Sequence, residues 1–180
     1  IFCLVFAGEM VFSLPFHITR FFRPTFLEVF NLSNTALGDI FAVYGATAML
    51  AYFPGGVIAD YFSARKLMTV SLFATAIGGL YLAQIPNVNG MSMLFAYWGI
   101  TSILLFWGAL IKGTREWGGP SAQGKAFGIL DGGRGLMAAG VATVAVFILG
   151  TLLPSDVNQT SVLARTNALC TIIYFYAVKN

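Results

Sequence analysis

The first apolar segment of the chain carries a row of polar side chains that could do chemistry inside a membrane. Ser13, His17 and Arg20 follow Glu9 by 4, 8 and 11 residues. At about 100° per residue, the four side chains fall within roughly 80° of one another on one face of an α-helix. Such a stripe on an apolar helix is typical of a cavity lining. The alternative is that these side chains pair with one another, with Arg20 reaching the outer surface; Arg23 is interpreted as interfacial.

Asp131 and Arg134 form a second polar pair in a long apolar, glycine-rich segment. They are three residues apart and are therefore neighbours on one helix face. A carboxylate whose partner can be exchanged suits a proton-binding site, because protonation would release the arginine. The planar fork of donors on an arginine suits a carboxylate or phosphate group of a solute. The alternative is an intrahelical pair that neutralises itself and has no further role.

The composition assigns the chain to a class of protein. Apolar residues make up 58% of it and charged residues only 9%, and the mean hydropathy is +0.81. A soluble domain carries about 25% charged residues. The sequence therefore predicts an all-α integral membrane protein. The net charge of +3 does not indicate a nucleic-acid partner, because no basic cluster exceeds two adjacent residues.

Six membrane-spanning helices are predicted. They cover residues 1–20, 36–58, 67–85, 91–111 and 126–153, and the sixth starts near residue 162 or 168. The first could continue to Phe26, and residues 28–35 connect it to the second, with Asn31, Ser33 or Asn34 as N-cap. Residues 86–90 are predicted to form a turn, and residues 113–124 and 154–167 to form loops. In the fifth helix, the spacing of Gly124, Gly128 and Gly132 predicts a smooth face for close helix packing.

We expect the chain to be a fragment of a larger protein, with residues 1–180 forming one six-helix domain truncated at both ends. It begins at Ile1 inside an apolar run. It ends after residues 168–178, an apolar stretch shorter than the roughly 20 residues needed to cross a bilayer. The first run is not expected to be a cleaved signal peptide, because it holds Glu9 and His17 and lacks a basic leader.

The distribution of cations predicts the orientation in the membrane. With a cytoplasmic N-terminus, the cations on the cytoplasmic side would be Arg65, Lys66, Lys112, Arg115, Lys125 and Lys179. Arg20, Arg23 and Arg165 would lie outside, and Arg134 within the membrane. This excess agrees with the positive-inside rule. The sequence therefore predicts a multi-pass membrane protein with its N-terminus in the cytoplasm.

Residues 55–66 form a small, charged hinge between the second and third spans. Two glycines are followed by Asp60 and then by Arg65 and Lys66, and charges this close to hydrocarbon need partners. We therefore expect an ion-pair latch at the tip of a tight helical hairpin.

The hinge resembles the signature loop of the major facilitator superfamily, through Gly56, Ile58, Ala59, Asp60, Arg65 and Lys66. Tyr61 and Ser63 depart from the usual basic residue and glycine. Residues 34–38 and 50–66 resemble the bacterial YihN-like branch, and residues 124–128 are similar to the organophosphate and organic-anion porters.

The resemblance implies a fold of twelve helices in two six-helix halves, of which this chain would be the N-terminal one and the C-terminal half would be absent. It implies a solute site at the midplane between the halves and a place in the bacterial inner (plasma) membrane. The residues it implies for the substrate and ion pathway are Glu9, His17, Arg20, Asp131 and Arg134. It also implies a conformational latch at Gly56, Asp60, Arg65 and Lys66.

The leading hypothesis is a secondary active transporter that moves a small polar or anionic organic solute by alternating access. Protons are the expected driver, with Glu9 or Asp131 as carrier. One alternative is a membrane receptor or sensor that keeps this fold without moving solute. A six-span membrane enzyme is the other, but the sequence shows no nucleophile or metal constellation for it.

No cofactor and no metal are expected as partners. The chain has one histidine, and its two cysteines, Cys3 and Cys170, are isolated in apolar runs. It has no Gly-Lys-Ser/Thr phosphate loop either, so the sequence shows no nucleotide-binding motif for an ATP-driven pump. The expected partners are the solute, a coupling proton, the lipid bilayer and the second half.

Overall fold

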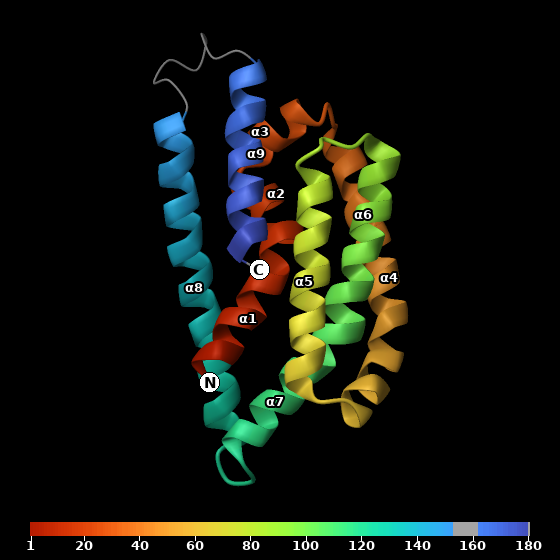
Figure 1. Cartoon of the computed structure of the whole chain (residues 1–180), viewed down its shortest axis with the longest axis vertical. Helices are drawn as coiled ribbons and strands as arrows, with labels where there is room; N and C mark the ends of the chain where they lie inside the picture. Colours follow the sequence, from red (N-terminus) through yellow and green to blue (C-terminus); the bar gives the residue numbers. More distant parts are fainter. Residues whose placement is uncertain (153–161, 180) are drawn as a thin grey trace.

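The computed structural model describes residues 1–152 and 162–179. In this part of the chain the regular structure is helical, and the long helices run side by side along the long axis of the molecule (Figure 1). The α4–α5 connection and the end of α7 lie at the lower end in this view, and α3 and the α5–α6 connection lie at the upper end.

The helices follow the order in which the sequence predicts them, with differences at their ends. The first rod consists of α1 (Phe2–Phe12), a π-helical segment η1 (Ser13–His17) and α2 (Ile18–Phe21). The fourth rod likewise contains α6 (Val88–Ile100), the π segment η2 (Thr101–Trp107) and α7 (Gly108–Gly118). The remaining helices are α3 (Arg23–Val29), α4 (Asn34–Tyr61), α5 (Ala64–Leu82), α8 (Gln123–Leu152) and α9 (Val162–Lys179).

Three of the predicted loops are wrong in part. The connection at residues 28–35 is shorter, because α3 extends to Val29 and α4 begins at Asn34. The loop predicted at residues 113–124 is helical as far as Gly118, so Arg115 and Glu116 stand on α7. The loop at 154–167 lies mostly outside the described residues, and α9 is helical from Val162.

Side-chain caps fix the starts of two helices. Ser33 Oγ accepts a hydrogen bond from Ala36 N at 3.0 Å, as expected for one of the three predicted caps of the second helix. Asn87 Oδ1 accepts one from Gly90 N at 2.8 Å within the predicted turn. Both caps satisfy amide groups that the first helical turn leaves without a partner.

Four of the rods are long and apolar enough to cross a membrane, judged by length and composition. They are Phe2–Phe21, Asn34–Tyr61, Val88–Gly118 and Gln123–Leu152. α5 does not meet these criteria, and the apolar part of α9, Val162–Val178, is shorter. The all-helical fold is thus confirmed for the described residues, with four candidate membrane spans, whereas the full set of six spans stays a prediction.

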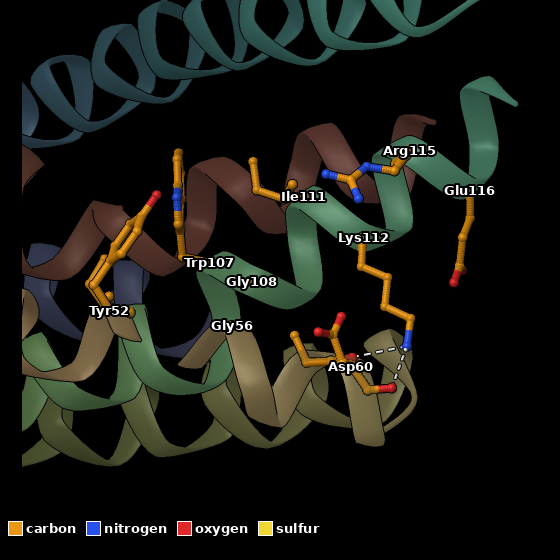
Figure 2. Close-up of a pocket in the computed structure, with 11 residues that line it drawn as sticks. Tyr52, Gly56, Asp60, Trp107, Gly108, Ile111, Lys112, Arg115 and Glu116 are labelled. Atoms are coloured by element: carbon orange, nitrogen blue, oxygen red, sulfur yellow. Dashed lines mark hydrogen bonds between the residues drawn. The ribbon is translucent and has the colours of Figure 1, made fainter. Parts of the chain in front are cut away.

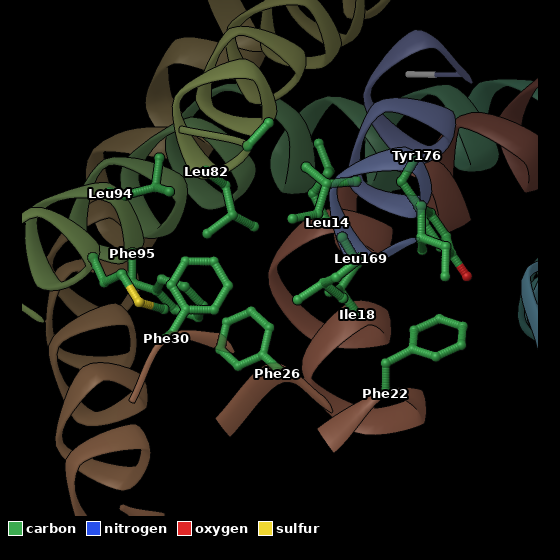
Figure 3. Packing of buried hydrophobic residues seen from close by; sticks show 14 of the residues in the cluster. Leu14, Ile18, Phe22, Phe26, Phe30, Leu82, Leu94, Phe95, Leu169 and Tyr176 are labelled. Atoms are coloured by element: carbon green, nitrogen blue, oxygen red, sulfur yellow. The ribbon is translucent and has the colours of Figure 1, made fainter. Parts of the chain in front are cut away.

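The largest apolar core lies where the first rod meets α3, α4, α5, α6 and α9, and Figure 3 shows part of its packing. Phe22 stands at the break between α2 and α3, and the ring centres of Phe26 in α3 and Phe30 at its end lie 4.5 Å apart in the same core. The fully buried residues Leu14 and Ile18 continue this core down the first rod. This packing holds the upper half of the first rod, and with it η1, against its neighbours.

The π segment η2 is held by polar side chains from neighbouring helices. Ser71 Oγ of α5 donates to the carbonyl oxygen of Thr101 at 2.7 Å. The hydroxyls of Tyr44 and Ser102 lie 2.7 Å apart, both buried. A π turn leaves backbone groups without their α-helical partners, and in lipid these must find another. Ser71 of α5 satisfies one such backbone group, and Tyr44 of α4 binds the Ser102 side chain of the same turn.

α4 packs on the fourth rod with almost no space between the backbones. A Cβ atom on Gly55 would lie 3.0 Å from the carbonyl oxygens of Ile103 and Leu104, and one on Gly108 would lie 3.0 Å from the carbonyl oxygen of Gly55. A Cβ atom on Gly99 would lie 2.7 Å from the carbonyl oxygen of Tyr44. Only glycine fits where two helix backbones approach so closely.

The glycine face predicted for close packing on the fifth helix, which is α8, is not packed against another helix in the described part of the chain. A Cβ atom added at Gly124, Gly128 or Gly132 would meet nothing within 4 Å, so no other described residue covers this face. The close contact of α8 is made at Gly133 instead, where an added Cβ would lie 2.8 Å from a methyl group of Val5 on α1. The expected close packing therefore occurs one residue away, on another face.

We expect Gly99→Ala to destabilise the protein by about 1–3 kcal/mol, because the added methyl group would force α4 and α6 apart. The matched control is Gly45→Ala in α4, where an added Cβ meets nothing within 4 Å. Both changes raise helix propensity equally, so their difference isolates the contact. Thermal unfolding in detergent measures it, and equal midpoints for the two variants would contradict the close packing.

Candidate functional site

Glu9 and His17 meet inside the first rod. Nε2 of His17 lies 2.8 Å from Oε1 of Glu9. In an ideal α-helix the two side chains would be turned about 80° apart. A π residue turns through a smaller angle than an α residue, so η1 brings His17 more nearly above Glu9. The irregular turn thus aligns the two ionisable groups.

A third ionisable side chain reaches Glu9 from α8. Nε of Arg134 lies 3.8 Å from Oε2 of Glu9, and an Nη atom of Arg134 lies 3.7 Å from a carboxylate oxygen of Asp131. The side chain of Glu9 is 6% exposed and that of Arg134 20%, whereas that of Asp131 is 72% exposed. Glu9 is therefore the buried centre of the charge cluster, and Asp131 lies at its edge.

Several polar atoms of the cluster make no hydrogen bond with the described residues. They are Oε1 of Glu9, Nδ1 of His17 and Nε of Arg134, all of them buried. His17 Nε2 and Glu9 Oε1 are close, but the angle between the two groups is unsuitable for a hydrogen bond. Buried polar groups are normally paired, and those that are not call for an explanation such as a bound ligand or a catalytic role.

Arg134 is positioned by a small residue and two aromatic rings. A Cβ on Gly8 would lie 3.1 Å from Cδ of Arg134, so the glycine leaves room for the arginine to pass across α1. Its guanidinium carbon lies 5.6 Å from the ring centre of Phe12 and 5.9 Å from that of Trp107. Cations are attracted to aromatic faces at such distances. The rings thus hold the guanidinium without using its hydrogen-bond donors.

A cavity of about 550 Å³ opens beside this cluster. Its charged lining consists of Glu9, Arg134, Arg20 and Arg23, together with His17. Arg23 donates hydrogen bonds to Oδ1 of Asn34 at 2.7 and 3.0 Å, and the guanidinium of Arg20 lies 5.9 Å from the ring centre of Phe21. Three arginines against one carboxylate give the cavity a positive potential, which favours an anion.

Most of the residues predicted for the solute pathway lie at this cavity. Glu9, His17, Arg20 and Arg134 line it, and Asp131 touches it only through Arg134. Sequence reasoning missed the aromatic residues Phe12 and Trp107, which border the cavity and Arg134. Phe12 stands between the two predicted residues Glu9 and His17, which was the only available signal.

A second cavity, of about 530 Å³, lies beside the predicted signature loop (Figure 2). Nζ of Lys112 donates to the carbonyl oxygens of Ala59, Asp60 and Phe62 at 2.9, 3.3 and 3.4 Å. It therefore caps the C-terminus of α4, where unpaired carbonyls attract a cation. The sequence did not single out Lys112, because the loop and the lysine are far apart in the chain.

The carboxylate of Asp60 faces this second cavity (Figure 2). Within the described ranges it forms no ion pair with Arg65 or Lys66, and all three side chains are exposed. In this arrangement Lys112 binds the loop backbone and leaves the Asp60 carboxylate available. Whether Gly56, Asp60, Arg65 and Lys66 act as a latch stays a prediction.

The described residues bring no three His, Cys, Asp or Glu side chains together that could hold a metal ion.

Comparisons with known proteins identify the family. The sequence model of the Major Facilitator Superfamily matches residues 2–175. The chain is 31% identical to the inner membrane protein YqcE of Escherichia coli (strain K12), over 96% of this chain and 38% of that protein. It is 30% identical to the inner membrane protein YihN of the same organism, over 81% of this chain and 34% of that protein.

The chain thus spans less than two fifths of the length of these curated relatives. No solved structure matches it significantly. The family match covers nearly the whole sequence, including the hinge at residues 55–66 and both polar segments. This chain therefore belongs to the Major Facilitator Superfamily.

Proposed function

We propose that this chain is the N-terminal six-helix half of a secondary active transporter, which moves a small anionic organic solute by alternating access with proton coupling. The family consists of transporters, which supports the general class. The relatives YqcE and YihN are named inner membrane proteins, which supports a place in the bacterial inner membrane. The cation distribution supports a cytoplasmic N-terminus.

The observation that carries the proposal is the state of Arg134. Its guanidinium is largely buried, its Nε makes no hydrogen bond, and the nearest carboxylates lie at 3.7 and 3.8 Å. Hydrogen bonds between an arginine and a carboxylate are about 2.7–2.9 Å long. The donors of Arg134 are therefore held ready for an anion that can approach more closely than Glu9 or Asp131.

Glu9 is the better candidate for the proton carrier. It is buried and faces both His17 and Arg134, whereas Asp131 is mostly exposed. Ionised Glu9 attracts Arg134 and competes with a solute anion for it. When Glu9 binds a proton this attraction ends, so protonation and anion binding favour each other. This is the relationship that proton–solute symport needs.

The second half of the transporter would supply the opposite wall of the cavity. The relatives are long enough to contain such a half, since this chain covers only 38% and 34% of them. In this proposal the exposed Asp60 carboxylate at the second cavity, together with Gly56, Arg65 and Lys66, contacts the other half in one conformation and releases it in the other.

We expect Arg134→Gln to abolish or strongly reduce uptake by the full-length protein. The loss of one charge-assisted hydrogen bond of about 1.5–3 kcal/mol corresponds to a decrease of about ten- to a hundredfold. The measurement is uptake of a panel of radiolabelled organic acids into proteoliposomes with an imposed pH gradient. Lys125→Gln, an exposed cation outside the cavity, is the control. Undiminished uptake by Arg134→Gln would remove the proposed role.

We expect Glu9→Gln to separate transport from its driving force. The neutral side chain should still permit exchange of labelled for unlabelled solute, but a pH gradient should no longer drive accumulation. Glu28→Gln, whose carboxylate pairs with Arg165 outside the cavity, should behave like the unchanged protein. Accumulation by Glu9→Gln would exclude Glu9 as carrier, and solute binding without any exchange would favour a receptor.

A further inference from the structure

We propose that the solute is a carboxylate with an aromatic body, rather than a sugar acid or another hydroxyl-rich anion. This inference rests on the proposed function, because it concerns the same cavity. It is carried by the neutral part of the cavity wall, which the argument for an anion does not use.

The wall next to Arg134 is a continuous series of aromatic rings. The rings of Trp107 and Phe12 have their centres 6.1 Å apart, as do those of Phe12 and Phe16. Phe16 in turn stacks on Phe41 at 5.6 Å. All four side chains line the cavity, and they come from three different rods. Aromatic rings prefer offset or edge-on contacts at these distances, which an aromatic ligand can extend.

The cation and the aromatic wall are close enough to bind two parts of one small molecule. The guanidinium carbon of Arg134 lies 5.6 and 5.9 Å from the ring centres of Phe12 and Trp107. A carboxylate that accepts hydrogen bonds from Arg134 would therefore place an attached ring against the same wall. A planar carboxylate also matches the planar donor fork of arginine.

The cavity offers little to a hydroxyl-rich solute. Among its described lining residues, Thr19 has the single uncharged hydroxyl or amide side chain. Its hydroxyl is directed at the carbonyl oxygens of Pro15 and Phe16, 3.2 and 3.0 Å away. On this side of the site, the hydroxyl groups of a sugar acid could therefore find partners at the charged cluster but not over the aromatic wall, where they would lose water without replacement.

The test compares three probes of similar size on the purified full-length protein by titration calorimetry. Phenylacetate carries both a ring and a carboxylate, gluconate carries a carboxylate and hydroxyls, and 2-phenylethanol carries a ring without charge. We expect phenylacetate to bind at least about tenfold more tightly than either of the others, because it alone engages both parts of the site.

Variants then locate the effect. Trp107→Leu and Phe12→Leu should each weaken phenylacetate binding several-fold more than gluconate binding. Both solutes lose the rings that position Arg134, but phenylacetate also loses its ring contact. Trp117→Leu is the matched control, because Trp117 is exposed and lies outside this cavity. Thermal unfolding of each variant identifies a loss that comes from misfolding. If Phe12→Leu is misfolded, Phe12→Tyr replaces it, because tyrosine keeps the ring. Phe12→Tyr should bind phenylacetate as the unchanged protein does, and weak binding by a folded Phe12→Tyr would count against the inference.

The outcomes separate this inference from the function on which it rests. If gluconate binds as tightly as phenylacetate, and Arg134→Gln abolishes both, the aromatic-body inference is wrong and the anion transporter stands. If 2-phenylethanol binds as tightly as phenylacetate, the carboxylate is not recognised and the inference is also wrong. If no probe depends on Arg134, the proposed function fails and the inference fails with it.

Discussion

The arrangement of the bundle depends on one constraint, which is that the carboxyl group of Glu9 is buried in an apolar segment where lipid offers no hydrogen bonds. A carboxylate in such a position needs cationic or hydrogen-bonding neighbours. His17 reaches it through the π turn η1, at 2.8 Å, and Arg134 reaches it from α8, at 3.8 Å. Gly8 leaves room for the arginine. The irregular turn, the glycine and the α1–α8 contact thus all bring polar partners to the carboxyl group of Glu9.

The sequence predicted those parts of the site that lie within one helix. The spacing of Glu9 and His17 placed them on one face, and Asp131 and Arg134 were expected to be neighbours; both pairs are in contact. The contact between Glu9 and Arg134 joins segments more than a hundred residues apart. No periodicity in a single sequence indicates which of two polar faces will meet, so this pair could not be predicted.

The errors in the helix boundaries have a similar origin. Residues 113–124 contain glycine and charged residues that are common in loops, yet the helix continues to Gly118. Lys112 and Thr114 provide a reason, because Lys112 binds the end of α4 and Thr114 is fully buried. On α8 the four-residue spacing of the glycines predicted a close helix contact, but no described residue lies against that face. Spacing within one helix does not specify which helix lies opposite.

Trp107 connects the two cavities and so links the proposed solute site to the signature loop. It is the last residue of η2, it lines both cavities, and its ring holds the guanidinium of Arg134. The next residue, Gly108, packs on the backbone of α4 at Gly55, a little more than one turn before Asp60. A solute that displaced the Trp107 ring would therefore press on the part of α4 that carries Asp60. Because the backbones already touch at Gly55, we expect α4 to move with the fourth rod rather than to repack locally.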